Sequence, residues 1–376
     1  GNTSDGGLAN FFSLLATEDN TTVQVEFPNA VVLENYAGPY PLSIPLNKNE
    51  TYVGMLDVST AFANRDGLLG AKVTSDKPIV VNTGSAAGSN GPGNGRDFGI
   101  DQIVDTDFAG TDYIFIRGVG NNSWENVMIV PTQPNTSIQI NGGGSIPITG
   151  AYYEIDGGFF DTDGNMFVQS DAPVVAYQGI GGVPGQEPNQ GMFYVPPLSC
   201  SSRGDVNNIP LINEIGTTSL GGDPWQGAIG IVAKTGVDVF VNGNIWTSGT
   251  VVSANTDYST YLINNLNDST YSVSSNDELY VSYYTYSGPA TSGSFYSGFP
   301  ANPEFSFDVN LNSLGNCLQN GVELTINGTQ NLDDFGWWYN PTSDADPSGW
   351  TDLGLSATTM LVPTSVGWYQ VRGEIN

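Results

Sequence analysis

Oxygen ligands suited to a hard cation are concentrated in one short segment of the chain. Asp161, Asp163 and Asn165 alternate around Gly164, and Asp156 precedes them. Calcium prefers oxygen ligands at alternate positions, and glycine permits the bend between them. The glutamate that closes an EF-hand loop is missing. The segment therefore predicts either a Ca²⁺ site formed by Asp156, Asp161, Asp163 and Asn165 or an ordinary Asp/Gly turn.

Tryptophan side chains are the candidates for binding a sugar. An exposed aromatic ring can stack on the C–H face of a pyranose. Trp124, Trp225 and Trp246 are the candidates for glycan binding. Aromatic residues at alternate strand positions also pack against neighbours across the sheet. Glycan binding and cross-strand packing therefore both remain open for these residues.

Catalysis is strongly limited by the absence of histidine from the 376 residues. A Ser-His-Asp triad, a Cys-His pair, an imidazole base and a His-ligated metal are all excluded. A pair of carboxylates, as in glycosidases, could still act. Because no motif places two carboxylates together, we expect a protein that is not an enzyme.

The chain contains two cysteines, Cys200 and Cys317. Two cysteines allow one disulfide and exclude a four-cysteine metal site. They could pair with each other, which an exported protein would tolerate. Alternatively, Cys317 could pair with a residue beyond Asn376, so the sequence leaves the pairing open.

Charge and hydropathy exclude two classes of partner. The formal net charge is −29, although only 12% of residues are charged. So few cations cannot neutralise a phosphate backbone, which excludes nucleic-acid binding. No apolar run reaches the roughly 18 residues needed to cross a bilayer, so we expect no membrane insertion.

The elements that would position these residues are predicted to be strands. The chain has 48 glycines and 22 prolines, and 11% of its residues are aromatic. This composition favours turns and strands over helices. No stretch of ten or more residues has convincing helical periodicity. The sequence therefore predicts an all-β fold built from many short strands.

An internal repeat organises most of the chain. An opening strand with alternating apolar residues recurs at 20–25, 135–142 and 235–243, and the last two copies end in Asn-Gly, typical of a type I′ turn. A second landmark, Ser-Asp followed by a β-branched run, recurs at 75–81 and 170–177, with a looser copy at 275–281. The landmark spacings are 95 and 105 residues, which is the size of a β-domain. We expect three related β-sandwich-like modules at 1–120, 121–225 and 226–303.

Residues 304–376 follow a different pattern that resembles an immunoglobulin-like sandwich. Val322, Leu324 and Ile326 alternate, a Trp-rich strand follows near 335–339, and Tyr369 lies in a Gly-x-Tyr-x-Val strand. In that fold a tryptophan is buried on strand C, and a corner tyrosine lies near strand F. The final strand of such a sandwich is not in the sequence. The resemblance therefore implies a domain completed by a strand from downstream or from a partner.

Residues 10 to about 300 resemble the IgGFc-binding-type module. The resemblance is carried by the Asn-Thr-Thr-Val openings, the Ser-Asp-x-Pro strands and the segment 194–200, in which Pro196-Pro197 lies near Cys200. Such modules occur in a mucin-like animal protein and in large bacterial surface proteins of the type IX secretion or gliding-motility class. The resemblance implies a secreted, cell-surface adhesin or filament component. IgG binding is not carried over, because no motif for it is identifiable.

Together these features predict a non-enzymatic extracellular adhesin, or a structural filament segment, of a larger secreted bacterial protein. A carbohydrate-binding module and a carboxylate-pair glycosidase are the alternatives. The expected partners are an extracellular surface, a glycan or neighbouring adhesin modules, with self-association through sheet edges. Calcium is the one cofactor that the sequence suggests.

Overall fold

Strands form nearly all of the regular structure in the computed structural model. The model describes residues 9–28, 30–57, 64, 66–88, 97–181, 192–199, 204–210, 226–264, 266, 270–288, 290–295, 306–311, 322–327, 334–342, 348–365 and 367–374. The helical turns in these ranges are short 3₁₀ segments, and none of them is long and apolar enough to cross a membrane. The all-β fold predicted from the sequence is confirmed.

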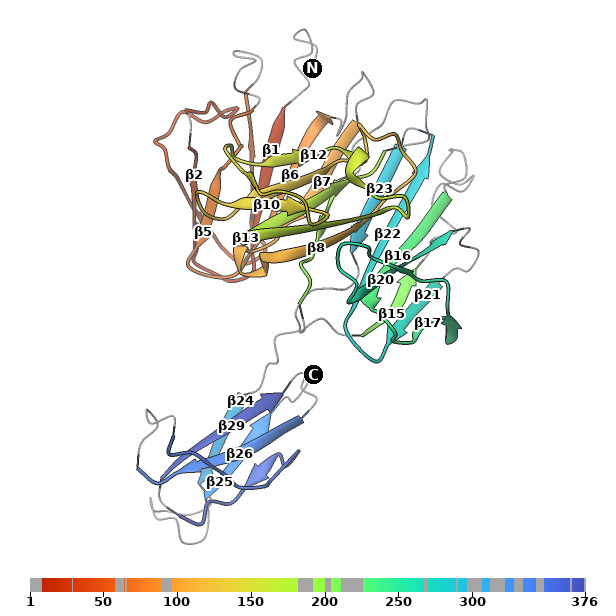
Figure 1. Ribbon diagram of the computed structural model, residues 1–376. Helices are drawn as coiled ribbons and strands as arrows, with labels where there is room; N and C mark the ends of the chain where they lie inside the picture. Colours follow the sequence, from red (N-terminus) through yellow and green to blue (C-terminus); the bar gives the residue numbers. More distant parts are fainter. Residues whose placement is uncertain are drawn as a thin grey trace. The chain divides into compact units, whose positions relative to one another are not determined.

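The chain divides into two compact units, with the division near residue 298. The described strands of the first unit, β1 to β23, group into three successive modules, and those of the second unit are β24 to β29 (Figure 1). Each unit is considered by itself below.

The first module is a pair of small antiparallel sheets. Their strand orders are β4-β1-β6-β7 and β3-β2-β5. Along β2, burial alternates residue by residue, as expected for a strand with one face on a core. The strands are β1 (Asn10–Ala16), β2 (Thr21–Glu26), β3 (Leu42–Leu46), β4 (Thr51–Met55), β5 (Lys72–Ser75), β6 (Ile79–Gly88) and β7 (Asp97–Ile103).

The second module is a single seven-stranded sheet arranged around one long strand, β13. The first half of β13 pairs with β10 and β8, and its second half pairs with β9 and β14. A register shift between Gln169 and Val174 separates the halves. The elements are η2 (Thr106–Phe108), β8 (Gly110–Ile116), β9 (Val127–Pro131), β10 (Ser137–Ile140), β11 (Ile146–Pro147), β12 (Tyr153–Ile155), η3 (Gly157–Phe159), β13 (Asn165–Gly179) and β14 (Met192–Val195).

The third module again has two separate sheets. Their orders are β15-β21-β17-β18 and β19-β20-β16-β22-β23. The strands are β15 (Asp205–Pro210), β16 (Gln226–Lys234), β17 (Val239–Val241), β18 (Asn244–Trp246), β19 (Thr250–Val251), β20 (Tyr258–Asn264), β21 (Thr270–Ser275), β22 (Leu279–Ser287) and β23 (Ala290–Phe295).

The predicted repeat is confirmed by the strand register. In each module a β-branched residue of the opening strand lies opposite the serine that starts the second landmark. These pairs are Val23–Ser75, Ile138–Ser170 and Val239–Ser275. After that serine the chain passes into another sheet in the first and third modules, and β13 shifts register in the second. The Ser-Asp-x-Pro motif is therefore the corner of the sandwich.

Strand pairing also shows where each module begins. β8 pairs with β13, and β15 pairs with β21, so each of these strands belongs to the module that follows it. Both lie upstream of the boundaries expected at 120/121 and 225/226. Those boundaries, and the one at 303/304, stay predictions.

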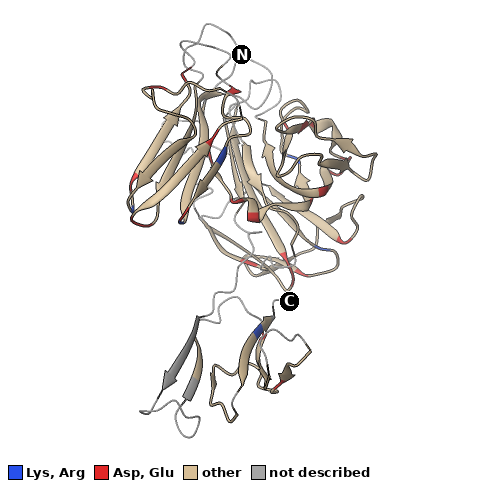
Figure 2. Ribbon diagram, turned by 90° about the vertical axis from the view of Figure 1, so that its left-hand side faces the viewer, with Lys and Arg blue, Asp and Glu red and all other residues tan. Residues whose placement is uncertain are grey.

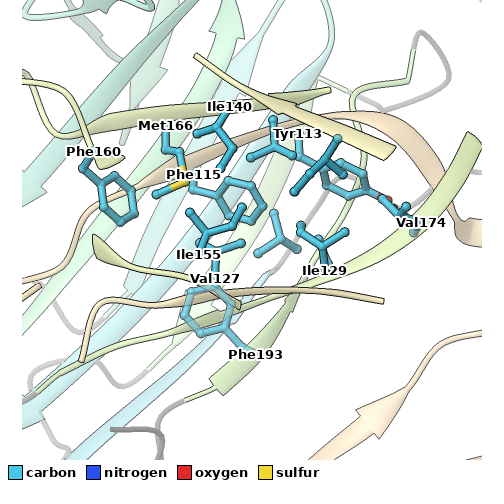
Figure 3. Packing of buried hydrophobic residues seen from close by; sticks show 14 of the residues in the cluster. Tyr113, Phe115, Val127, Ile129, Ile140, Ile155, Phe160, Met166, Val174 and Phe193 are labelled. Carbon is cyan, nitrogen blue, oxygen red and sulfur yellow. Dashed lines mark hydrogen bonds between the residues drawn. The ribbon is translucent and has the colours of Figure 1, made fainter. Parts of the chain in front are cut away.

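The largest described core lies in the second module. Side chains from β8, β9, β12 and β13 meet there, among them Phe115, Val127, Ile155 and Met166 (Figure 3). Tyr113 is buried beside Phe115, with ring centroids 6.2 Å apart, and its hydroxyl donates to the carbonyl of Val174. This hydrogen bond joins the two halves of the sandwich.

The second unit contains two small sheets around one tryptophan. Their orders are β24-β25-β28 and β27-β26-β29. Trp337 is fully buried, and its Nε1 donates to the carbonyl of Thr358 at 2.7 Å. Tyr369 donates its hydroxyl to the carbonyl of Ser365 at 2.8 Å. The strands are β24 (Ser306–Leu311), β25 (Val322–Asn327), β26 (Asp334–Asn340), β27 (Thr351–Asp352), β28 (Met360–Leu361) and β29 (Trp368–Glu374).

Candidate functional site

A small cavity in the third module contains one of the three candidate tryptophans. Its volume is about 260 Å³, and Trp246 forms part of its wall. Three asparagines, a tyrosine and two aliphatic side chains complete the wall. They are Asn242, Asn244, Asn264, Tyr271, Val241 and Ile263. The cavity therefore combines aromatic rings with amide groups.

The hairpin of β17 and β18 positions Trp246 at this cavity. Asn242 and Gly243 form its turn with φ values of 49° and 72°, a left-handed conformation that Asn and Gly tolerate best. The type I′ turn predicted from the sequence is confirmed here. Asn242 also anchors the hairpin to β21, because its Oδ1 accepts from the backbone N–H of Ser272 at 2.8 Å. Trp246 is thereby placed directly opposite Val239.

Unlike the indole nitrogen of Trp337, the indole nitrogen of Trp246 donates no hydrogen bond within the described chain. It is buried and has no hydrogen-bond partner among the described residues. A buried donor without a partner costs about 1–3 kcal/mol.

The second module places a different side chain at the equivalent position. Ile146 lies opposite Ile138 in β10, as Trp246 lies opposite Val239 in β17. Ile146 packs against the core of its module, where Phe160 is also buried. Trp246 likewise packs against the core of the third module, so the two modules share the framework here and differ in the side chain.

A buried charged network fixes the third module against the end of the second. Glu278 is 4% exposed, and its carboxylate accepts from the hydroxyls of Tyr258 and Tyr280 at 2.6 and 2.7 Å. Lys234 Nζ lies 2.8 Å from Glu278 Oε1. The Tyr280 hydroxyl also accepts from the backbone N–H of Ser199. Burial, followed by the hydrogen bond to Glu278, raises the pKa of Tyr258 to about 12.

A second buried carboxylate, Glu125, stabilises the loops at one end of the second module. Its oxygens accept from the backbone N–H groups of Gly118, Gly120 and Gly181 at 2.9, 2.7 and 3.1 Å. Burial raises the pKa of Glu125, although these hydrogen bonds and the nearby Arg117 oppose the shift. Because its oxygens are occupied by backbone donors, Glu125 has a structural role.

The proposed calcium ligands accept hydrogen bonds within the chain. Asp161 Oδ1 accepts from the backbone N–H groups of Asp163 and Asn165 at 3.0 and 2.9 Å, and Asp161 Oδ2 accepts from the Ser253 hydroxyl at 3.0 Å. Asp156 accepts from Gly158 N–H at 2.8 Å and caps η3. Within the described part of the chain, no group of three or more acidic or cysteine side chains is arranged to hold a metal. Calcium binding stays a prediction.

Trp124, the other described tryptophan among the glycan candidates, does not line the Trp246 cavity. Trp124 is half-buried in the second module, where its Cβ packs near Gly181. Trp225, Cys200 and Cys317 lie outside the described residues. Sequence reasoning identified Trp246 but missed Tyr271 and the three asparagines, which only the folded strands bring together.

A larger cavity of about 320 Å³ lies between the first and second modules. Its wall includes Leu68, Leu69, Met128, Val130 and Ala151, so it is mainly apolar. It lacks a cluster of amide groups like that beside Trp246. The smaller cavity is therefore the better candidate for recognising a polar ligand.

Fold and site together define a protein of tandem β-sandwich modules, one of which carries an aromatic and amide-lined cavity. The model of the family described as IgGFc binding protein matches residues 1–287, and the chain belongs to this family. The family is one of extracellular, non-catalytic binding proteins. No match was found among curated proteins.

Proposed function

We propose that the chain is a non-enzymatic adhesive segment of an extracellular surface protein and that its third module binds a sugar residue. The observation that carries the proposal is the cavity in which Trp246 and Tyr271 lie beside three asparagines, within the described residues. An indole ring and amide groups are the chemistry that recognises a pyranose.

The size of the cavity limits the ligand. At about 260 Å³ it is smaller than the 300–1,000 Å³ typical of sites for drug-sized ligands. It suits a single terminal sugar ring with neutral hydroxyl groups. Acidic positions are spread over the described ribbon (Figure 2), and the net charge of −29 disfavours an anionic sugar.

A glycan array with the intact chain and the variant Trp246→Ala tests this function. Binding to glycans that share one terminal neutral sugar should be lost in Trp246→Ala. Ile245→Ala is the matched control, because Ile245 is the adjacent residue of β18 and is 53% exposed. Equal binding by both variants, or no binding by the intact chain, would show that the cavity is not a sugar site.

An open sheet edge supports a second candidate function, the joining of modules into a filament. β8 and β15 cover the equivalent edges in the second and third modules, whereas β5 has no outer partner among the described strands. Val73 is half-buried, but the equivalent Val168 and Val273 are 0% and 1% exposed. An added strand would complete the burial of Val73.

Light scattering over a range of concentrations tests this second function. Strand addition at β5 predicts concentration-dependent self-association. Ser75→Pro should abolish it, because the Asp76 N–H bonds to the Thr22 carbonyl of β2 and the N–H of the preceding residue, Ser75, therefore points to the open edge. A monodisperse monomer at every concentration would contradict self-association of this chain.

The proposal also covers the fold of the second unit and the class of surface protein to which the chain would belong. The buried Trp337 and the Tyr369–Ser365 hydrogen bond support an immunoglobulin-like second unit. An adhesin with this order of modules suits a bacterial surface protein of the type IX secretion or gliding class. The Fc region of IgG is not proposed as the ligand, because no motif in the chain identifies it.

A further inference from the structure

An aromatic surface lies on the outer face of the β27-β26-β29 sheet in the second unit. Trp338 pairs with Gln370, and Asn340 pairs with Trp368. Residues paired across antiparallel strands project to the same face. This places Trp338 and Trp368 on the side opposite the core residue Trp337. Trp368 is 49% exposed, which is unusual for so large an apolar ring.

Arg372 holds two of the rings in place. Its guanidinium carbon lies 4.9 Å from the ring centroid of Trp338 and 6.0 Å from that of Trp350. Gly336, the cross-strand partner of Arg372, makes room for this stack, since a Cβ there would approach Trp338 Cζ3 to 3.1 Å. Two of the seven tryptophans of the chain thus lie against one arginine, and Trp368 shares the sheet face of Trp338.

Hydrogen-bonding groups of both kinds border the rings. Gln370 and Asp352 are exposed and lie on either side of Trp338 in the neighbouring strands. Arg372 Nε donates to Gln370 Oε1 at 3.3 Å, which fixes these two side chains beside each other. The terminal nitrogens of Arg372 and the amide nitrogen of Gln370 supply donors, and the carboxylate of Asp352 supplies acceptors. Sugar hydroxyls need donors and acceptors together, so this border suits them.

The excess of acidic residues in the second unit favours a neutral ligand over an anionic one. Residues 299–376 contain nine acidic side chains, and their one basic residue is Arg372. The resulting field repels polyanions. Among the described side chains, Arg372 has no ion-pair partner, so it stays available to a hydroxyl oxygen while its planar face stacks on the tryptophans.

We propose that Trp338, Trp350 and Trp368, with Arg372 and Gln370, form a binding platform for a linear neutral polysaccharide. An extended β-1,4-linked chain presents the C–H faces of successive rings, which an open sheet face can contact together. This site is distinct from the Trp246 cavity, which suits one terminal ring. The two sites lie in different units and can be tested separately.

Calorimetric titration of the intact chain with cellohexaose and chitohexaose tests the platform. At least one of these neutral hexasaccharides should bind, and Trp368→Ala should weaken that binding at least tenfold. Met360→Ala is the matched control, because Met360 is 50% exposed on the other sheet of the same unit. Trp246→Ala should leave this binding unchanged, even if the Trp246 cavity proves not to bind a sugar.

A second variant separates ring contact from folding. Arg372→Lys keeps the charge but loses the planar stack, so it should weaken binding while thermal unfolding stays cooperative. An anionic oligogalacturonate should not bind. The platform would be refuted by the absence of binding to both neutral hexasaccharides, by unchanged binding in Trp368→Ala, or by equal binding of the anionic oligomer.

Discussion

The carboxylate of Asp171 accepts a hydrogen bond from the backbone N–H of Ser137 at 2.8 Å, and it does so where β13 shifts its register. Asp76 makes the same contact with Thr22 at 2.7 Å in the first module. In each of these two modules, the aspartate of the Ser-Asp landmark therefore accepts a hydrogen bond from a backbone N–H at the opening strand.

Removal of this contact should destabilise the second module. Asp171→Ala leaves the Ser137 N–H without its partner, so the free energy of unfolding should fall by about 1–2 kcal/mol. Urea unfolding measures the change. Glu34→Ala, at an exposed carboxylate in a loop, should shift stability by less than about 0.5 kcal/mol. Equal effects of the two variants would show that the corner hydrogen bond is dispensable.

Glu278 should contribute more to the free energy of unfolding than its ion pair with Lys234 alone would. Glu278→Gln keeps the shape but replaces an acceptor with a donor beside two tyrosine hydroxyls. We expect a loss of about 1–3 kcal/mol in the free energy of unfolding. Lys234→Met should cost less, because Lys234 is 36% exposed and solvent screens its charge. The opposite order would indicate that the ion pair dominates.

Alkaline pH should weaken the same network. The pKa of Tyr258 is raised from 10.0 to about 12, so the folded state holds its proton more tightly than the unfolded state does. The resulting stabilisation is complete below pH 10 and is lost as the pH rises through about 12. Unfolding free energies measured between pH 9 and 12 should therefore decline less steeply in Tyr258→Phe than in the wild type. A parallel decline would contradict the assignment.

Close approach of the second and third modules depends on a glycine. A Cβ at Gly293 would lie 2.4 Å from Phe193 Cδ1, so the two strands could not keep their spacing. Gly293→Ala should lower the melting temperature, consistent with a cost of about 1–3 kcal/mol. Gly144→Ala is the control, because no atom lies within 4 Å of its added Cβ. Equal melting temperatures would show that the contact can relax.

The repeat and its turns could be predicted from the sequence because they depend on local chemistry. Alternating apolar residues define the strands, and Asn-Gly permits the left-handed turn observed at Asn242 and Gly243. The placement of β8 and β15 could not be predicted in this way. Each of these strands belongs to the module whose edge strand it pairs with, and that partner is far away in the sequence. Such pairing produces no distinctive pattern in the residues of the strand itself.

The sites were predictable only in part, for a similar reason. Trp246 was identified as an aromatic candidate, but Asn264 and Tyr271 reach its cavity from separate strands. Trp337 and Trp338 are adjacent and identical in type, yet one is fully buried and the other lies on the outer face. Only the sheet register distinguishes them, since a shift of one residue would exchange their environments.

The equivalence of Ile146 and Trp246 has an evolutionary consequence. Modules that share a register but not a side chain are what duplication of an ancestral segment, followed by divergence, would produce. A copy in which the position stays aliphatic preserves the packing of its own sandwich. Another copy can then acquire a tryptophan at this position without a loss of stability in the adjacent modules. With several copies of the module, a substitution at this position can alter ligand binding in one copy only. The Ser-Asp residues at the start of the second landmark make the same contacts in more than one module, so we expect them to change less.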